Sequence, residues 1–370
     1  METNKVVTPV IVFAPNVLAG AERVVITGTI ALHELGVQPH LIVIQETRAP
    51  HYAENFIKEF PKDLKISVVK SVKALDFKLS TQIEIAMKQD TNVIIHTHGF
   101  KALVACGLIR NKKYKHVHTH HGNTSHTFKV RVYEWMANLA MKRCDHVIAV
   151  SEEMKSKLLQ TLAPYKNITA IPNMLSFKNA EAIRNIRRSK PYSQALQLVF
   201  IGRLSPEKGL MSLLGNLNAS SFKEDIHLTV LGDGDENLAA RNFVEAMKLN
   251  SSVTFKGFVN NPSDYLKTAD ALVLPSFTEG LPMTLIEAIA CGVPVIANDV
   301  GAVSSLLVHL KNGYLTKSND FSEWEAAFKA LKNQVASWQD YALENGPAIE
   351  AVHNRKTWAE RTMKLYLEIT

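Results

Sequence analysis

Short apolar runs alternate with longer segments of helical apolar spacing over most of the 370-residue chain. Runs such as "VIVFA", "LVFIG" and "ALVLP" are apolar on both faces, which is the pattern of parallel strands covered by helices. The first predicted strands are Val7–Ala14, His40–Ile44, Lys65–Val69, Val93–His98, His116–His121 and Asp145–Val150. The second group comprises Leu196–Ile201, Ile226–Leu231, Val253–Phe255, Ala271–Leu274, Pro294–Ile296 and Gly313–Leu315. The pattern therefore predicts α/β architecture twice, as two doubly wound parallel sheets facing a central cleft.

A polar, basic stretch at residues 176–194 separates the two groups of strands and contains Pro191. It is typical of an interdomain connection. We therefore expect an N-terminal domain at residues 1–175 and a C-terminal domain at 195–350. The final segment, from about 351 to 370, has a helical pattern.

The composition, 46% hydrophobic and 21% charged, is that of an ordinary globular protein. Its three cysteines, Cys106, Cys144 and Cys291, are widely spaced in apolar contexts. This argues against a disulfide framework and favours reduced core thiols in a cytoplasmic protein. No run reaches the ~18 to 20 apolar residues of a membrane span.

The net charge of +7 is unevenly distributed. Between Lys101 and Lys190 there are 17 basic and 5 acidic residues, which indicates an anionic partner. Nucleic acid is disfavoured because no recognised nucleic-acid motif accompanies the charge. Residues 127–143, "TFKVRVYEWMANLAMKR", mix aromatic, apolar and basic side chains. Two interpretations stay open: peripheral contact with an anionic membrane, or a helix packed on a sheet with solvated basic ends.

The stretch "PSFTEGLPMTLIEAIACGVPVIA", from Pro275 to Ala297, is apolar yet contains Glu279 and Glu287. A helix is predicted over Pro282–Cys291, with proline at its first position and Gly292 as its stop. Glu287 would be buried on this helix and needs a cation or hydroxyl donors, either an internal Arg or Lys or the hydroxyls of a ligand.

Glu279 is predicted in the loop ahead of that helix. Backbone N–H groups of Gly280, Leu281, Met283 and Thr284 would lie at the positive end of the helix dipole and form an anion site. The loop "FIGRLSPEKGL" adds two cations, Arg203 and Lys208, after the turn at Gly202. Such cations suit a diphosphate, although one of them could instead be the internal partner of Glu287.

Six histidines lie in "IIHTHGF" and "HVHTHHGNT": His96, His98, His116, His118, His120 and His121. Strand alternation would send neighbouring side chains to opposite faces, so hydrogen bonding to substrate or proton transfer is favoured over a zinc site. Asp233 and Asp235 in "LGDGDE" resemble a metal-binding pair but fit a tight turn equally well.

These residues together resemble the retaining glycosyltransferases of GT-B fold, in the family 4 (group 1) type. The resemblance covers essentially the whole chain and is strongest from Leu198 to Gly313. Its most specific element is the E-x7-E signature within the Pro275–Ala297 stretch. Matching elements are the "GRLxPEKG" loop, the "GDG" turn, "IPN" at the domain boundary and the Gly-Ala-Glu turn after the first strand.

The resemblance implies two Rossmann-like domains, the N-terminal one binding acceptor and the C-terminal one binding the nucleotide sugar, with the last helix crossing back onto the first. It implies contact of Glu279 with donor-sugar hydroxyls and of Glu287 with the ribose. Arg203 and Lys208 would hold the diphosphate. His121, or His120 in a shifted register, would lie beside the reacting sugar. The backbone of Gly20 would approach the diphosphate or acceptor, and Phe258 and Val259 would lie beside the base.

The chain departs from the family pattern at Ala19-Gly20, where paired glycines are usual, and at Met174, where glycine is common after "IPN". The resemblance implies a hexosyltransferase that moves a hexose or N-acetylhexosamine from a UDP-sugar to a glycan or lipid-linked acceptor in bacterial surface-polysaccharide synthesis. No metal cofactor is expected. Alternatives are an epimerase or phosphorylase of the same fold and a non-catalytic glycan-binding module. A nicotinamide enzyme is disfavoured because no G-x-G-x-x-G follows the first strand.

Overall fold

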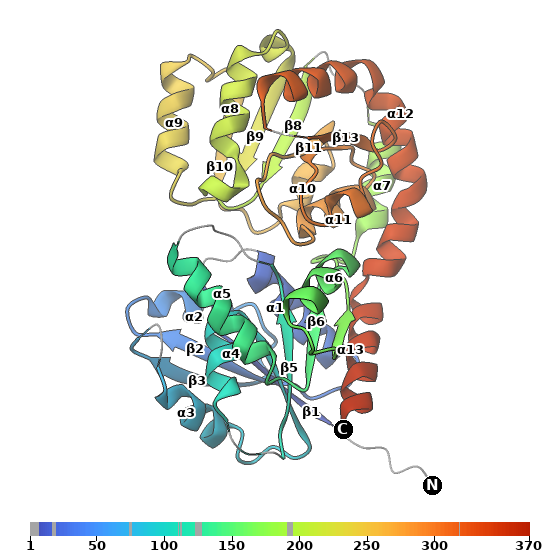
Figure 1. Ribbon diagram of the computed structural model, residues 1–370. Helices are drawn as coiled ribbons and strands as arrows, with labels where there is room; N and C mark the ends of the chain where they lie inside the picture. Colours follow the sequence, from blue (N-terminus) through green and yellow to red (C-terminus); the bar gives the residue numbers. More distant parts are fainter. Residues whose placement is uncertain are drawn as a thin grey trace. The chain divides into compact units, whose positions relative to one another are not determined.

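The computed structural model describes residues 7–16, 20–73, 76–109, 111, 113–122, 128–190, 195–317 and 319–370, with backbone only at 128–134. The chain divides into two compact units (Figure 1). Unit 1 contains residues 1–176 and 354–370, and unit 2 contains residues 177–353. The chain thus leaves the first unit once and returns to it.

Unit 1 is built on a seven-stranded parallel sheet of order β3-β2-β1-β4-β5-β6-β7. Its strands are β1 (Thr8–Phe13), β2 (His40–Glu46), β3 (Lys65–Ser71), β4 (Val93–His98), β5 (Lys115–His120), β6 (His146–Ala149) and β7 (Ile168–Ala170). Its helices are α1 (Gly20–Glu34), α2 (Pro50–Ile57), α3 (Lys78–Ala86), α4 (Phe100–Gly107), α5 (Phe128–Met141), α6 (Glu152–Thr161) and α13 (Arg355–Ile369). The six strands predicted for this part of the chain are present, and β7 is an addition whose three residues are too short to show a period.

Unit 2 is built on a six-stranded parallel sheet of order β10-β9-β8-β11-β12-β13. Its strands are β8 (Leu196–Ile201), β9 (Ile226–Leu231), β10 (Val253–Gly257), β11 (Ala271–Leu274), β12 (Val295–Asn298) and β13 (Gly313–Thr316). Its α-helices are α7 (Ala180–Arg188), α8 (Leu210–Ala219), α9 (Asn237–Ala246), α10 (Ser263–Leu266), α11 (Met283–Ala290) and α12 (Phe321–His353). Three short 3-10 helices are η1 (Pro206–Lys208), η2 (Lys223–Asp225) and η3 (Val303–Ser305). The two parallel sheets confirm the predicted fold class.

The cores are the strand faces and the helices that cover them. In unit 1, Val10 and Val12 of β1 pack with Leu79 and Ile83 of α3. In unit 2, the strand residues pack with α8, α9 and α12, including the fully buried Trp324. Central strands of both sheets are buried along their whole length, as the doubly apolar runs predicted.

Part of the segment assigned to an interdomain connection forms α7, which belongs to unit 2. Its buried positions Ala180, Ile183, Arg184 and Arg187 follow helical spacing. Arg184 and Arg187 make the sequence of this segment polar, which predicts exposure to solvent, although both side chains are buried in unit 2.

The C-terminal segment 354–370 packs on α1 in unit 1. A Cβ added to Gly28 of α1 would lie 2.7 Å from the Trp358 ring, so this glycine permits the close approach of α13. Asn354 begins α13 as its N-cap and accepts a hydrogen bond from Thr357 N at 2.8 Å. The break before α13 therefore has a local cause.

Candidate functional site

The carboxyl ends of the strands in unit 2 carry loops that are bonded to one another. Leu204 N donates to Asp233 O at 3.0 Å, and Glu236 N donates to Leu204 O at 2.9 Å. A Cβ on Gly232, at φ +135°, would lie 1.8 Å from Gly202 O. The "GDG" turn after β9 thus packs directly on the loop after β8, and only glycine permits this approach.

The same edge joins the loop after β8 to the loop after β11. Gly209 has φ +69°, and a Cβ there would lie 2.1 Å from Pro275 O. Phe277 N donates to Glu207 O at 2.9 Å. Because the backbones touch, the residues just before Gly209 and just after Phe277 are held beside each other.

That contact brings together two residues singled out from the sequence. Lys208 Nζ lies 2.6 Å from Glu279 Oε1, with 26% of the lysine side chain and 10% of the glutamate side chain exposed. The pair is therefore half-buried, with the lysine the more accessible of the two side chains. An ammonium group has three donors, so Lys208 can hold Glu279 and still donate to an anion.

Arg203 lies in the same loop, three residues before Pro206. Its side chain is half-buried, and its Nε is buried without a hydrogen-bond partner in the described part of the chain. A buried unsatisfied donor is costly, and an anion at this edge would satisfy it. The two cations predicted for a diphosphate thus flank one loop.

Helix α11 follows the Glu279 loop. Its first residue is Met283, whereas Pro282 is the N-cap with an extended backbone, so the prediction that Pro282 is the first residue of the helix was wrong by one position. Proline tolerates this position because an N-cap needs no intrahelical N–H bond. Ala302 N donates to Gly280 O at 2.9 Å and fixes the loop from the β12 side. At the start of α11, Leu281 and Met283 are buried while Thr284 is partly exposed.

Glu287 is buried on α11, with 4% of its surface exposed, as expected. Cys291 lies one turn later, and burial raises the pKa of its thiol. The charge of Glu287 adds to this increase, whereas the charges of Arg187 and Arg184 oppose it. Glu287 therefore shares its surroundings with internal arginines. A contact of Glu287 with a ribose stays a prediction.

The residues predicted beside the base directly follow β10. Gly257, at φ +69°, turns the chain, Phe258 is 47% exposed and Val259 is half-buried.

Sequence reasoning missed Phe277, which is 55% exposed only two residues before Glu279. It also missed Asn298, whose side-chain amide donates to Pro275 O at 3.1 Å and Ser276 O at 3.0 Å. An amide side chain at the end of the apolar run "VPVIAN" was the available signal.

The turn predicted at Asp233 and Asp235 is present. Asp233 Oδ1 accepts from Gly234 N at 2.8 Å and from Asn237 Nδ2 at 2.7 Å, so this carboxylate closes its own turn. Within the described ranges, no group of three or more His, Cys, Asp or Glu is arranged to hold a metal ion.

In unit 1, Gly20 begins α1 after β1, close to its predicted position. A Cβ built on Gly20 meets nothing within 4 Å, so the space over this backbone is open. Ala19, the departure from paired glycines, lies outside the described residues.

The histidines of unit 1 lie on two faces of the sheet, as strand alternation predicted. His96 Nε2 lies 2.7 Å from Thr119 Oγ1, and its Nδ1 lies 2.5 Å from the Tyr366 hydroxyl of α13. Thr97, the next residue, points the other way and bonds His116 Nε2 at 2.9 Å and His118 Nδ1 at 3.1 Å. The six side chains therefore do not form one cluster.

His121 follows β5, and its Nε2 lies 3.0 Å from His98 Nδ1. Burial lowers the pKa of His121 to about 3, and the neighbouring His120 contributes. A neutral imidazole whose Nε2 is engaged by His98 can offer only Nδ1 to a ligand. The His120 ring lies near that of His118, with the ring centroids 6.3 Å apart. Burial lowers the pKa of His120 to about 4.

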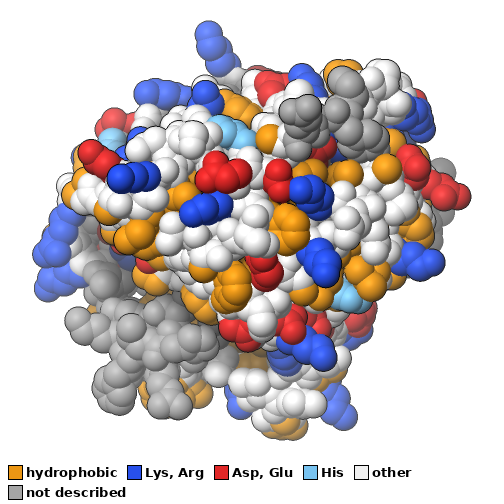
Figure 2. Space-filling model, turned by 90° about the horizontal axis from the view of Figure 1, so that it is seen from above, with side chains coloured by type: hydrophobic (Ala, Val, Ile, Leu, Met, Phe, Trp, Pro, Cys, Tyr) orange, Lys and Arg blue, Asp and Glu red, His pale blue; other side chains and the backbone are white. Residues whose placement is uncertain are grey.

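The surface carries charges of both signs. On the face in Figure 2, Lys and Arg side chains are interspersed with Asp and Glu among scattered hydrophobic groups. Exposed aromatic and aliphatic side chains also occur on α5, where Trp135 is 63% and Leu139 is 46% exposed. None of the helices in the described part of the chain is both long enough and apolar enough to cross a membrane.

Comparison with known proteins agrees with this arrangement. The family described as "Glycosyltransferase Family 4" matches residues 18–176, and the family "Glycosyl transferases group 1" matches residues 182–342. An uncharacterized glycosyltransferase of Haemophilus influenzae is 28% identical over 319 residues, covering 85% of this chain and 87% of that protein. A UDP-Gal:alpha-D-GlcNAc-diphosphoundecaprenol alpha-1,3-galactosyltransferase of Escherichia coli is 25% identical over 283 residues, covering 70% of each chain.

Solved structures share the fold. HepE of Anabaena, in complex with UDP, superposes with a TM-score of 0.78 at 17% identity, covering 98% of this chain and 100% of that one. The lipopolysaccharide outer core galactosyltransferase WaaB, in its apo form, gives 0.74 at 17% identity, covering 98% and 99%. The two family matches, the GT-B fold and the loops at the carboxyl edge of unit 2 together establish that the chain belongs to the group 1, family 4 glycosyltransferases, enzymes that use nucleotide-sugar donors.

Proposed function

We propose that this enzyme transfers a hexose or N-acetylhexosamine from a UDP-sugar to a glycan or lipid-linked acceptor in bacterial surface-polysaccharide synthesis, with retention at the anomeric carbon. The observation that carries the proposal is the Lys208–Glu279 pair at the carboxyl edge of a doubly wound sheet, with Arg203 in the same loop as Lys208. UDP in the HepE structure and the UDP-galactose donor in the name of the E. coli relative support the choice of base.

The two charges of the pair have different tasks. As the diphosphate leaves, negative charge grows on its oxygens, and Arg203, Lys208 and the amides at the start of α11 stabilise it. Glu279 accepts hydrogen bonds from donor-sugar hydroxyls and keeps the Lys208 ammonium oriented. Glu287 binds the ribose, and Phe258 and Val259 pack beside the base.

In this proposal the acceptor attacks from the face that the diphosphate leaves, because no side chain is assigned as a covalent nucleophile. His121 lies beside the reacting sugar with Nδ1 available, and Gly20 leaves room over its backbone for a phosphate or acceptor. Unit 1 binds the acceptor. Exposed Trp135 and Leu139, with Lys142 and Arg143 on the same segment, favour a lipid-linked acceptor reached from an anionic membrane surface.

Calorimetric titration with UDP, GDP and their common sugars tests the donor site. We expect binding of UDP and of one or more UDP-sugars, with loss of affinity in Glu287→Ala. Product analysis then distinguishes a transferase, which needs an acceptor, from an epimerase or a phosphate-dependent phosphorylase. No heat with any nucleotide, with or without acceptor, would contradict the proposal.

A further inference from the structure

Helix α7 places two arginines in the interior of unit 2. Arg187 is fully buried and Arg184 is 4% exposed. Buried guanidinium groups are retained only where their donors are satisfied. The groups that accept hydrogen bonds from the two arginines show which elements of unit 2 are joined to α7.

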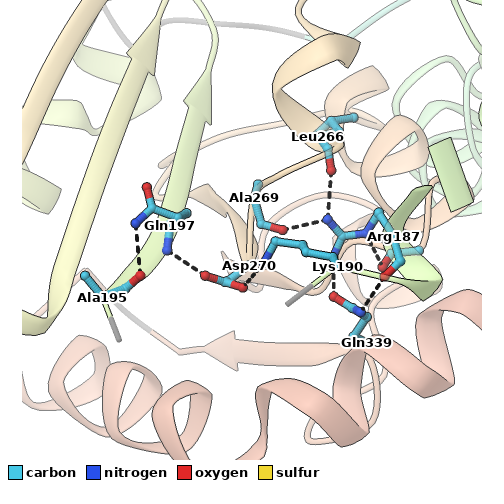
Figure 3. Close-up of polar contacts among 9 residues, drawn as sticks. Arg187, Lys190, Ala195, Gln197, Leu266, Ala269, Asp270 and Gln339 are labelled. Atoms are coloured by element: carbon cyan, nitrogen blue, oxygen red, sulfur yellow. Dashed lines mark hydrogen bonds and ion pairs between the residues drawn. The ribbon is translucent and has the colours of Figure 1, made fainter. Parts of the chain in front are cut away.

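The acceptors are mostly backbone carbonyls at helix ends (Figure 3). Arg187 Nη1 donates at 2.8 Å to the O atom of Leu266, the last residue of α10, and at 2.6 Å to Ala269 O in the segment that follows. Its Nη2 donates to Gln339 Oε1 of α12 at 2.8 Å. One side chain thus joins three elements of unit 2.

Both arginines donate hydrogen bonds to carbonyl groups at the carboxyl end of α11. Arg187 Nε donates to Gly292 O at 3.0 Å, and Arg184 Nη1 donates to Ala290 O. The last carbonyls of a helix lack intrahelical partners, and cations are favourable there because of the helix dipole. Arg184 is itself held by Glu350 of α12 through a 2.7 Å ion pair.

Two glycines allow α12 to pack closely against this end of α11. A Cβ on Gly292, at φ +74°, would lie 2.4 Å from the Leu343 side chain, and one on Gly346 would lie 2.8 Å from Ala290 O. Helix α12 therefore lies directly against the end of α11. This packing opposes a shift of the carboxyl end towards α12, and the hydrogen bonds of the arginines oppose a shift along the axis.

The other end of α11 carries the candidate donor site. Helix α11 is only eight residues long, Met283–Ala290; the Glu279 loop precedes it, and the carbonyls that the arginines bind lie at its carboxyl end. A short rigid helix transmits displacement of one end to the other, and a misplacement of about 1 Å can cost 10²-fold in rate.

We propose that Arg187 and Arg184 are positioning residues of the donor site, which set the place of Glu279 and the first turn of α11 by holding the far end of the helix. This inference rests on the proposed function. It predicts that loss of the guanidinium fork weakens binding of UDP, although neither arginine belongs to the loops assigned to the donor.

The same region contains a matched control. Lys190, three residues after Arg187, pairs with Asp270, whose other oxygen accepts from Gln197 N at 2.7 Å (Figure 3). This pair is also buried, with 10% and 2% of the side chains exposed. It joins the amino ends of β8 and β11, the edge opposite to the Glu279 loop, so Lys190→Met should reduce stability without moving α11.

The experiment compares Arg187→Lys, Arg184→Lys and Lys190→Met with wild type. Thermal unfolding identifies a temperature at which all are folded, and calorimetry there measures the Kd for UDP. We expect about tenfold weaker binding in Arg187→Lys and weaker binding in Arg184→Lys, with Lys190→Met within twofold of wild type. Millimolar guanidinium should restore part of the UDP affinity in Arg187→Ala.

Unchanged UDP affinity in both Arg→Lys variants would overturn the inference, as would an equal loss in Lys190→Met. If Arg187→Lys does not fold, Arg184→Lys still decides. Wild-type protein that does not bind UDP would instead contradict the proposed function, so the two failures are distinguishable.

Discussion

Lys208 Nζ and Glu279 Oε1 lie 2.6 Å apart, although 71 positions separate the two residues in the chain. The contact follows from the parallel topology, because β8 and β11 are neighbours and their carboxyl ends lie at one edge. A cation and a carboxylate that the sequence presented as separate motifs thus form one ion pair.

Replacing this cation should impair catalysis more than stability. In Lys208→Met, we expect kcat to fall by about 10²- to 10³-fold, because the leaving diphosphate loses a preorganised charge. Release of UDP in the presence of acceptor measures the rate. Lys332→Met is the control, since Lys332 pairs with Asp225 on the surface, with 44% and 40% of the side chains exposed. Equal rates in both variants would exclude Lys208 from the reaction.

The approach of the two loops depends on Gly209. In Gly209→Ala, a Cβ would meet Pro275 O at 2.1 Å in a backbone at φ +69°, so the loops must separate. We expect a loss of stability of about 1–3 kcal/mol together with weaker UDP binding. Chemical denaturation and calorimetry measure the two effects.

Gly215→Ala provides the matched control for that substitution. Gly215 lies within α8, and a Cβ there meets nothing within 4 Å. Alanine should therefore stabilise the protein by about 0.5–1 kcal/mol and leave binding unchanged. Stability of Gly209→Ala equal to or above that of Gly215→Ala would contradict the role of the close contact.

The strands and the two loops that contain Lys208 and Glu279 could be predicted because their signals are local, but the ion pair between the two residues was not predicted. A run such as "ALVL" is apolar on both faces whatever surrounds it, and the loops that follow such runs share an edge by topology. The role of α7 could not be predicted, because Arg184 and Arg187 make the segment polar. Most of their acceptors are backbone carbonyl groups, which every residue has, so the sequence does not show which carbonyls accept these bonds.

Acid should destabilise the protein through its buried histidines. Burial lowers the pKa of His96 to about 3 and of His116 to about 4, below the ordinary value near 6.5. Unfolded chains bind protons below about pH 6.5 while the folded protein does not. The stability is therefore full above pH 6.5 and falls as the pH decreases towards 4, by about 1.4 kcal/mol per pH unit for each such histidine.

Urea unfolding at pH 7.5, 6 and 5 measures this dependence in a range where most carboxylates stay ionised. His120→Gln should make the slope shallower, because burial holds the pKa of His120 near 4 in the wild type. A free energy of unfolding independent of pH would show that these imidazoles are protonated in the folded state.

A lipid-linked acceptor predicts association with anionic membranes through α5. Trp135 and Leu139, four positions apart, are exposed on one helix face, and the basic Lys142 and Arg143 follow. The Trp135→Ser, Leu139→Ser double variant should sediment less with vesicles containing phosphatidylglycerol. Leu238→Ser is the control, since Leu238 is 72% exposed on α9 in the other unit. Equal sedimentation of the two variants would contradict the α5 surface.

Turnover should be insensitive to EDTA, because Arg203 and Lys208 supply the positive charge that a metal would otherwise provide to the diphosphate. The Asp233 carboxylate instead serves its own turn, accepting from Gly234 N and Asn237 Nδ2. Asp233→Asn retains an oxygen for these bonds but weakens a metal ligand, so near wild-type turnover is expected. Loss of turnover in EDTA that manganese restores, together with an inactive Asp233→Asn enzyme, would instead place a metal ion at this turn.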